Sequence, residues 1–396
     1  MFARGAVAAA VADRPFVQAM LDVEAAAARA CAAVGLTPGA AAAAIAEAAD
    51  ADRFDLAALA AETARHATPV IGLVAALRVL VGPDAAPHVH RGLTSQDVVD
   101  SAAMILAHRA LGLLSDDAAG AAEAAARLAA AHRDTPIAGR TLLQHALPTT
   151  FGLKAAGWMT GLDEALGDLA AVRDGVLAVQ LGGAAGTLAA FGAHGAAVTA
   201  AVAADLGLAE PVLPWHAIRR RPAVLAGALG TLAGVLAKIA RDVTLLAQTE
   251  VGEVREGGAD LGRGGSSAMA HKRNPVAAVS AAACAARVPG LVATMLSVMD
   301  QEHERAAGGW QAEWETQRSL LTLTGSAAAW VRELLDDLEV DAARMGATAE
   351  AAVGALGDGG PQALADGVSA AAALVDRALA AHAAAHARPP RPGGPA

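Results

Sequence analysis

The sequence predicts an all-α fold made of long helices. Ala, Leu and Val dominate, aromatic residues make up 3% of the chain and Tyr is absent, so residues that favour strands are scarce and helix formers are abundant. Between Leu225 and Leu246, apolar residues recur in steps of three and four and form one continuous stripe. Strand signals are essentially absent, so we expect helices joined by polar segments.

Apolar residues at helical spacing set the order of the elements. They predict one helix over residues 15–34 and a second that begins after Thr37-Pro38. The stripe over 222–254 predicts a helix whose length is typical of an extended bundle. Further helices are expected from 95 past 111 and over 154–177, 275–298 and 314–338. Gly182, Gly183 and Gly186 mark a loop, and the Pro/Gly-rich tail 388–396 is expected to be disordered.

Composition and charge argue against several classes of function. The formal net charge of -10 disfavours nucleic acid as a partner, so an anionic substrate needs a local cationic cluster. Cys31 and Cys284 give no disulfide framework or metal spacing, which suits a reducing cytoplasm. An early pair of charges argues against a signal peptide. The uncharged stretch between Asp174 and Asp205 is rich in Ala and Gly, so we expect a buried loop and helix and no membrane span.

The segment over residues 264–275 has the clearest features of an active-site loop. Its glycines make it mobile, Ser266 and Ser267 offer hydroxyls, and a Lys/Arg pair attracts anions. Asn274-Pro275 is typical of a helix start, with Asn as the cap and Pro at the first helical position. These features predict an active-site loop that closes over its ligand, and an ordinary Gly-rich connection is the alternative.

Three further polar islands interrupt the apolar helices: His90–Asp97, Arg140–His145 and Gln301–Arg305. Alone, the first is typical of a capped helix start, the second of a turn and the third of a solvated helix face, while His145 fits a buried imidazole. The Glu-His-Glu run lacks a third ligand at fixed spacing, so we expect no metal site. Together with the loop, the islands supply many cationic and hydrogen-bonding side chains and few carboxylates, a set suited to binding carboxylates.

The four segments resemble, in order, the signature regions of the fumarase/aspartase superfamily. The loop Gly265-Ser-Ser-x-Met-x-x-Lys272-x-Asn274 is similar to its highly specific signature loop. His90-x-Gly-x-Thr94-Ser-x-Asp97 and Gly139-Arg140-Thr141 resemble its first two regions. Within the superfamily, the runs Arg140-Thr-Leu-Leu-Gln-His-Ala-Leu-Pro148 and Glu302-His-Glu-Arg-Ala-Ala-Gly-Gly-Trp310 resemble the carboxymuconate cycloisomerase branch.

The resemblance implies a three-domain helical subunit, whose parts we place at residues 1–105, 106–345 and 346–396. The second part is a central long-helix bundle that carries the signature loop over 257–275, and the third is a short helical region with a tail. A homotetramer is implied, with active sites assembled from three subunits, so the islands of one chain need not meet. We expect a small polycarboxylate substrate and no cofactor.

The resemblance also implies roles for single residues. Ser266 matches the serine that moves a proton α to a carboxylate, with Ser267 beside it. A free serine is too weak a base, so Lys272 and backbone amides are expected to stabilise its alkoxide in a closed site. The residues expected to bind the substrate are His90, Thr94, Ser95, Gln96, Arg140, Thr141, Gln144, His145, Lys272, Asn274 and Arg305.

Two positions depart from the superfamily pattern. Leu142 stands where C–N lyases and fumarases usually carry a His, and Val279 where they carry a Glu that supports it. An amine or hydroxide leaving group needs a proton, whereas a carboxylate, whose acid has a pKa of about 4, does not. The sequence therefore favours a lactone-forming cycloisomerase. A C–N or C–O lyase acting on a succinyl-type substrate and a catalytically silent helical scaffold are the alternatives.

Overall fold

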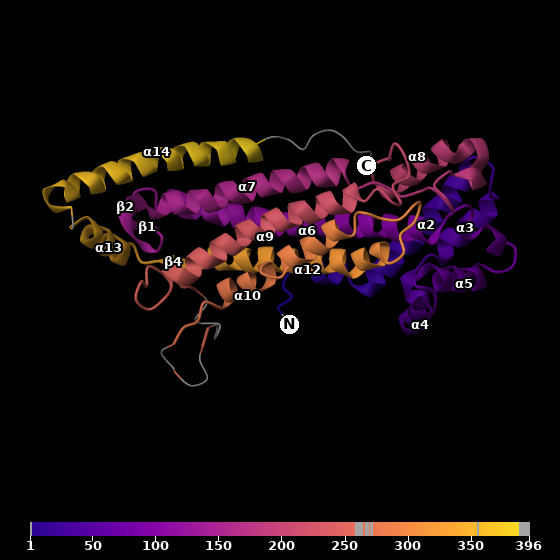
Figure 1. Ribbon diagram of the computed structural model, residues 1–396, viewed down its shortest axis with the longest axis horizontal. Coiled ribbons are helices and arrows are strands. Elements are labelled where there is room, and N and C mark those ends of the chain that lie inside the picture. Colours follow the sequence, from indigo (N-terminus) through magenta and orange to yellow (C-terminus); the bar gives the residue numbers. More distant parts are fainter. Residues whose placement is uncertain (1, 258–263, 266–268, 270–271, 355, 388–396) are drawn as a thin grey trace.

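The computed structural model describes residues 2–257, 264–265, 269, 272–354 and 356–387. The subunit is elongated, with long helices parallel to its length and shorter elements at both ends (Figure 1). Its middle is formed by four long helices, α6 (Ser95–Ala131), α7 (Phe151–Gly175), α9 (Arg220–Leu246) and α12 (Gly309–Asp336). Helices α6 and α9 each contact both α7 and α12, so the four helices enclose one core.

The core of this bundle is made mostly of Ala, Leu and Val. Leu225, Leu229, Leu232 and Leu236, which belong to the predicted stripe on α9, are fully buried. Helix α10 (Val276–Ala285) packs on α9 and α12. Because α6 has 37 residues and a helix rises 1.5 Å per residue, the bundle is about 55 Å long.

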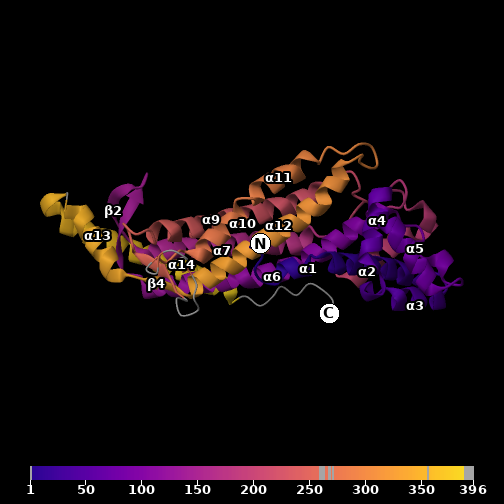
Figure 2. The ribbon, with the colours of Figure 1, turned by 90° about the horizontal axis from the view of Figure 1, so that it is seen from below.

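Shorter helices gather around the two ends of α6. At its first end lie α2 (Asp13–Ala33), α3 (Gly39–Ala48), α4 (Leu56–His66), α5 (Val70–Val81) and α8 (Gly195–Leu206). At its last end lie α13 (Ala342–Gly354) and the strands. Helix α1 (Val7–Ala10) contacts α6 and α12, and α11 (Val288–Ser297) lies on α9 and α12 (Figure 2). We call the two ends the α2 end and the hairpin end.

Two short antiparallel sheets lie at the hairpin end, where the sequence predicts only polar connections. Strand β1 (Pro136–Thr141) pairs with β2 (Gln144–Thr150), and β3 (Val254–Glu256) pairs with β4 (Leu338–Val340). The first hairpin turns at Leu142-Leu143, with φ of 52° and 64°. Two-residue hairpin turns of this kind usually carry Asn-Gly, so Leu-Leu gives no turn signal. The all-α fold class is confirmed, because the strands are small additions to a helical bundle.

Most predicted helices are present, and two differ in extent. The helix predicted over 222–254 ends at Leu246, after which the chain turns into β3. The helix predicted over 275–298 is two helices, α10 and α11. The break follows from Pro289, which has no N–H and would clash with the carbonyl of residue 285 in a continuous helix. The three-domain division stays a prediction, and α6 runs unbroken across residue 105.

By length and composition alone, five helical segments in the described ranges are apolar enough to cross a membrane. They are Ser95–Ala131, Ala189–Leu206, Arg220–Leu246, Val276–Ser297 and Gly357–His386. The most apolar window of the first is 67% buried inside the subunit, and that of the third 50%. Helices that form the core of a bundle are apolar for this reason. The absence of a membrane span stays a prediction.

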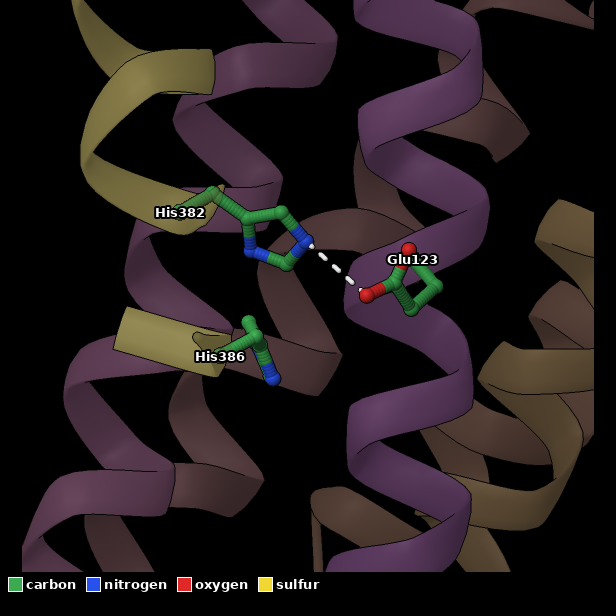
Figure 3. Close-up of side chains that lie close together, drawn as sticks. All are labelled: Glu123, His382 and His386. Carbon is green, nitrogen blue, oxygen red and sulfur yellow. Dashed lines mark hydrogen bonds and ion pairs between the residues drawn. The ribbon is translucent and has the colours of Figure 1, made fainter. Parts of the chain in front are cut away.

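The C-terminal helix α14 (Gly360–His386) lies along α7 and also contacts α6, α13 and β2. Near its last turn, His382 points between neighbouring helices and approaches Glu123 of α6 (Figure 3). The tail 388–396, which is expected to be disordered, lies outside the described residues.

Candidate active site

The first polar island lies at the α2 end, where α6 begins. Asp97 is fully buried, and its carboxylate accepts four hydrogen bonds, from Thr94 N (3.0 Å), Gly182 N (3.0 Å), Gly183 N (2.9 Å) and His216 Nε2 (2.7 Å). The bond from Thr94 belongs to a capping box, so the expected capped helix start is present. The same carboxylate fixes the predicted glycine loop against the start of α6.

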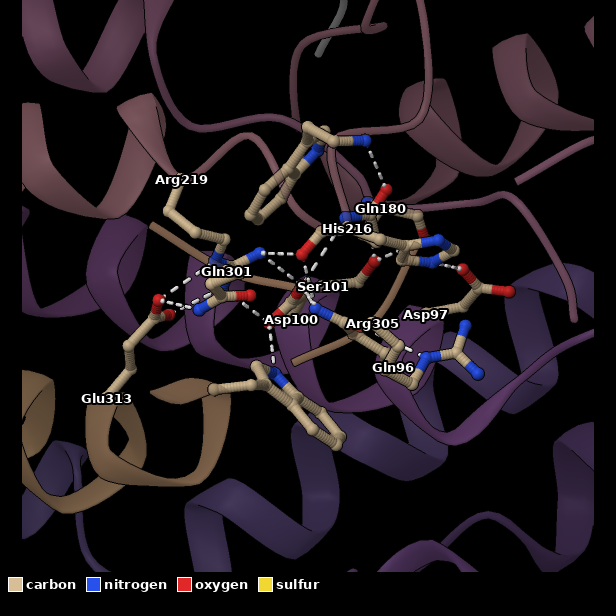
Figure 4. Close-up of polar contacts among 12 residues, drawn as sticks. Gln96, Asp97, Asp100, Ser101, Gln180, His216, Arg219, Gln301, Arg305 and Glu313 are labelled. Carbon is tan, nitrogen blue, oxygen red and sulfur yellow. Dashed lines mark hydrogen bonds and ion pairs between the residues drawn. The ribbon is translucent and has the colours of Figure 1, made fainter. Parts of the chain in front are cut away.

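Gln96 and Arg305 join the first island to the island Gln301–Arg305 (Figure 4). Arg305 Nε donates to Gln96 Oε1 at 3.2 Å, and one Arg305 Nη donates to Gly183 O at 3.4 Å. Gln96 is fully buried, and its Nε2 donates to His216 O at 2.8 Å, which orients the amide towards Arg305. A half-buried guanidinium held in this way is suited to a carboxylate ligand, because it presents N–H donors in a planar fork.

A buried ion network that the sequence analysis does not identify lies beside this pair (Figure 4). Arg219 is 2% exposed and donates to Asp100 through both Nη atoms at 2.8 and 3.0 Å. It also donates to Glu313 from Nε and Nη at 2.9 and 2.5 Å. Burial raises the pKa of Glu313, although Arg219 opposes that shift. Trp310 Nε1 donates to Asp100 at 2.9 Å, so α6, α12 and the start of α9 are locked together.

His90 is held at the same end by an ion pair with α2. Its Nδ1 lies 2.6 Å from Oε1 of Glu24, a carboxylate that is only 1% exposed. Burial by itself lowers the pKa of His90, but the Glu24 carboxylate more than offsets this, and the pKa is raised. Thr94 and Ser95 are half-buried nearby in sequence, at the start of α6.

The second island lies at the hairpin end, on β1 and β2. Both Nη atoms of Arg140 donate to the fully buried Glu253 carboxylate, at 2.7 and 3.0 Å. This bidentate pair anchors the hairpin to the segment that follows α9. Thr141, Gln144 and His145 are exposed, so the alternative of a buried imidazole at His145 is wrong.

The signature loop follows β3 at the hairpin end. Ser266 and Ser267 lie outside the described residues. Lys272 is exposed, and Asn274 is half-buried at the base of the loop. Backbone N and Nδ2 of Asn274 both donate to Gly264 O, at 2.8 and 3.3 Å, so Asn274 joins the two sides of this base.

The helix after the loop is capped from β3. Helix α10 begins at Val276, and the Glu256 carboxylate accepts the N–H groups of residues 277 and 278 at 3.0 and 2.8 Å. The prediction that Asn274 caps this helix with Pro275 at its first position is therefore wrong. A carboxylate at this place satisfies two orphan amides and interacts favourably with the helix dipole. A cavity of about 500 Å³ borders Glu256, Asn274 and Arg273.

The two positions that depart from the superfamily pattern are both at the surface. The Leu142 side chain, at the tip of the hairpin, is 96% exposed, and Val279 on α10 is 51% exposed. Neither side chain can donate or accept a proton. The hairpin end thus presents apolar groups at both of these positions.

The predicted residues come together in two groups. The α2 end holds His90, Thr94, Ser95, Gln96 and Arg305. The hairpin end holds Arg140, Thr141, Gln144, His145, Lys272 and Asn274. Helix α6, about 55 Å long, separates the two groups, which is far beyond the reach of any side chain. A site that used residues of both groups would need a second copy of the chain.

Known proteins match this chain over most of its length. A family model described as "Lyase" matches residues 3–290. The 3-carboxy-cis,cis-muconate cycloisomerase of Bradyrhizobium diazoefficiens is 48% identical over 360 residues, covering 90% of this chain and 79% of that protein. The nitrosuccinate lyase of Streptomyces davaonensis is 48% identical over 350 residues, covering 86% and 73%. The crystal structure of 3-carboxy-cis,cis-muconate lactonizing enzyme from Pseudomonas putida matches with a TM-score of 0.89, 38% identity and 98% coverage of both chains.

Proposed function

This chain belongs to the lyase family, and on that premise we propose that it is a 3-carboxy-cis,cis-muconate cycloisomerase. It interconverts this triacid with a carboxymuconolactone, a step of aromatic catabolism in the β-ketoadipate pathway of protocatechuate degradation. The observation that carries the proposal is the similarity to cycloisomerases over most of the chain, and the apolar pair Leu142 and Val279 supports it, because a carboxylate leaving group needs no proton.

The reaction balances with one proton and one C–O bond. In the lactonising direction, a carboxylate oxygen of the substrate adds to an alkene carbon, and the electron pair moves to the carbon α to another carboxylate. Ser266 delivers a proton to that carbon. In the reverse direction its alkoxide removes the proton, the C–O bond breaks and the carboxylate departs as an anion.

The substrate's negative charges require a local cationic site, because the chain has a net charge of -10. We assign one carboxylate to Lys272 and Asn274 at the loop, and another to Arg305, whose guanidinium Gln96 holds in place. Hydrogen bonds to the rest of the substrate are assigned to His90, Thr94, Ser95, Thr141, Gln144 and His145. Arg140, bound to Glu253, holds the hairpin that presents three of these groups.

We propose a homotetramer in which the α2 end of one subunit meets the hairpin end of others. The separation of the two groups along α6 supports this arrangement. So do the apolar side chains of the hairpin, since Leu142, Leu143 and Leu147 are 96%, 73% and 66% exposed, and clustered exposed leucines are typical of a surface that another chain covers. The buried free thiols of Cys31 and Cys284 suit the cytoplasm, which we propose as its location.

A second candidate reaction is nitrite elimination from nitrosuccinate. It is favoured by the relative that carries this activity in its name. Nitrite, like a carboxylate, is the anion of an acid and leaves without a proton. The apolar pair Leu142 and Val279 is therefore compatible with both reactions.

Two assays separate these functions. With micromolar enzyme, we expect the ultraviolet absorbance of 3-carboxymuconate to fall; an unchanged absorbance would exclude the cycloisomerase. Nitrite release from nitrosuccinate would support the second candidate, and fumarate release from an aspartate derivative would support a C–N lyase of the usual kind. A lack of turnover on all of these substrates would leave the silent scaffold. Light scattering of the same preparation tests the tetramer.

A further inference from the structure

We propose that Glu123, His382 and His386 form a binding site for a divalent transition metal of the zinc class, with Asp163 as the residue that positions His382. The four side chains come from three helices, α6, α7 and α14, and Figure 3 shows Glu123, His382 and His386. The site is independent of the proposed reaction, and its role is to fasten the C-terminal helix to the bundle.

The two histidines form a chelating pair on α14. Residues four apart lie on one face of a helix, and the rings of His382 and His386 lie at a centroid distance of 4.4 Å, tilted by 58° to each other. One ligand atom from each of them and one from Glu123 all lie within 4.8 Å of one another. Two imidazoles and a carboxylate are a donor set that Zn²⁺ and its neighbours in the periodic table prefer.

Asp163 determines which nitrogen of His382 faces the site. Its Oδ2 lies 2.8 Å from Nδ1 of His382, and this carboxylate accepts a hydrogen bond from that nitrogen. In a neutral imidazole the lone pair is then on Nε2, which lies 3.3 Å from Glu123 Oε1. A histidine that donates to a carboxylate from one nitrogen and ligates through the other is the usual arrangement at metal sites.

The distance between these two atoms fits a shared metal ion. Two ligand atoms on a tetrahedral zinc, with bonds of about 2.0–2.1 Å, lie about 3.3 Å apart, as His382 Nε2 and Glu123 Oε1 do. His386 and Glu123 are partly exposed, at 40% and 54%, so their side chains have room to adjust to a bound ion. His382 is only 7% exposed and supplies the fixed side of the site.

The same cluster without a metal would be His382 held between the Asp163 and Glu123 carboxylates, and the two cases make different predictions. If the cluster is a metal site, it binds one Zn²⁺ per chain and retains the ion on dilution. An ion-paired histidine binds none, and zinc leaves the thermal stability of the chain unchanged.

The test titrates the full-length, chelator-treated chain with Zn²⁺ by calorimetry and with Co²⁺ by visible absorption. We expect one ion per chain, a tetrahedral Co²⁺ spectrum and a higher thermal midpoint with Zn²⁺. Both His386→Ala and Glu123→Gln alter exposed side chains, so they should fold, and each should weaken Zn²⁺ binding at least about tenfold.

The matched control is His66→Ala. His66 is 40% exposed and lies 3.3 Å from Glu62 on the same helix, but it belongs to no cluster of three such ligands among the described residues. Its removal should leave Zn²⁺ binding unchanged. The proposal would be overturned if Zn²⁺ binding is not saturable. It would also be overturned if neither His386→Ala nor Glu123→Gln weakens that binding. Muconate turnover should be the same in His386→Ala as in the wild type, which separates this test from that of the proposed function.

Discussion

The α2 end and the hairpin end of this subunit present their polar residues in opposite ways. At the α2 end, Gln96, Asp97 and Arg219 are buried, and their partners come from the same chain. At the hairpin end, Thr141, Gln144 and Lys272 are exposed. The comparison indicates a platform of buried polar contacts at one end and, at the other, exposed polar groups that the proposed tetramer would bring against a neighbouring subunit.

The largest effect on stability is expected from loss of the buried ion network around Arg219. Arg219→Met leaves Asp100 and Glu313 buried without their cation, which typically costs about 3–5 kcal/mol of stability. The control is Arg127→Met, because Arg127 pairs with Asp336 at the surface, where both are largely exposed and such pairs contribute about 0–1 kcal/mol. The measurement is urea unfolding. Equal losses of unfolding free energy in the two variants would show that the buried network contributes no more to stability than a surface ion pair.

Removal of the Ser266 hydroxyl should lower the catalytic rate and leave the stability of the chain unchanged. We expect Ser266→Ala to lower kcat at least about a hundredfold, equivalent to about 2.7 kcal/mol of barrier, with an unchanged urea midpoint. Ser297→Ala is the control, since Ser297 is an exposed serine on α11. Wild-type rates in Ser266→Ala would remove Ser266 from its proposed role.

Loss of the ion pair between Arg140 and Glu253 should lower both the stability of the chain and its affinity for substrate. Arg140→Met leaves the buried Glu253 carboxylate without its bidentate partner, at a cost of about 2 kcal/mol, and we expect KM for 3-carboxymuconate to rise about tenfold because the hairpin loses its position. Arg255→Met, which breaks an exposed pair with Glu339 at the same end, should change neither quantity. If both variants behave alike, Arg140 does not position the hairpin.

The smallest effect is expected from His90. Its pKa is raised in the folded chain above the ordinary 6.5, so its ion pair with Glu24 contributes stability that is fully present below that value. The contribution is lost as pH rises through the folded-state pKa. The difference in thermal midpoint between the wild type and His90→Gln should therefore shrink from mildly acidic to alkaline pH. A difference that is constant or grows with pH would contradict this assignment.

The sequence is a good guide to the helices and a poor guide to their ends. The stripe on α9 predicts a helix because apolar spacing is a local property. Its end at Leu246 and the strand that follows depend on pairing of β3 with β4, which lies more than 80 residues later. The Leu142-Leu143 turn is likewise decided by the pairing of its strands, since neither residue favours positive φ.

Site residues were predictable where local motifs carry them and not where distant segments meet. The capped start at Thr94 is visible in sequence because cap and helix are adjacent. No comparable motif marks the buried ion network, because Arg219, Asp100 and Glu313 are single charges in three distant segments. The two histidines on α14 were not predicted as a site, because the carboxylates that they meet lie on α6 and α7. Glu256 replaced Asn274 as a cap for the same reason.

The sequence by itself determined the all-α class, because that class follows from residue type and short spacing, and its resemblance to the superfamily identified the signature loop and the apolar residues Leu142 and Val279. Only the tertiary structure decided that the islands divide between two ends of α6, that Arg140 is bound to Glu253, and that Arg305 is held by Gln96. These contacts join residues more than 100 positions apart, and such pairs meet only after packing has fixed the direction of every helix.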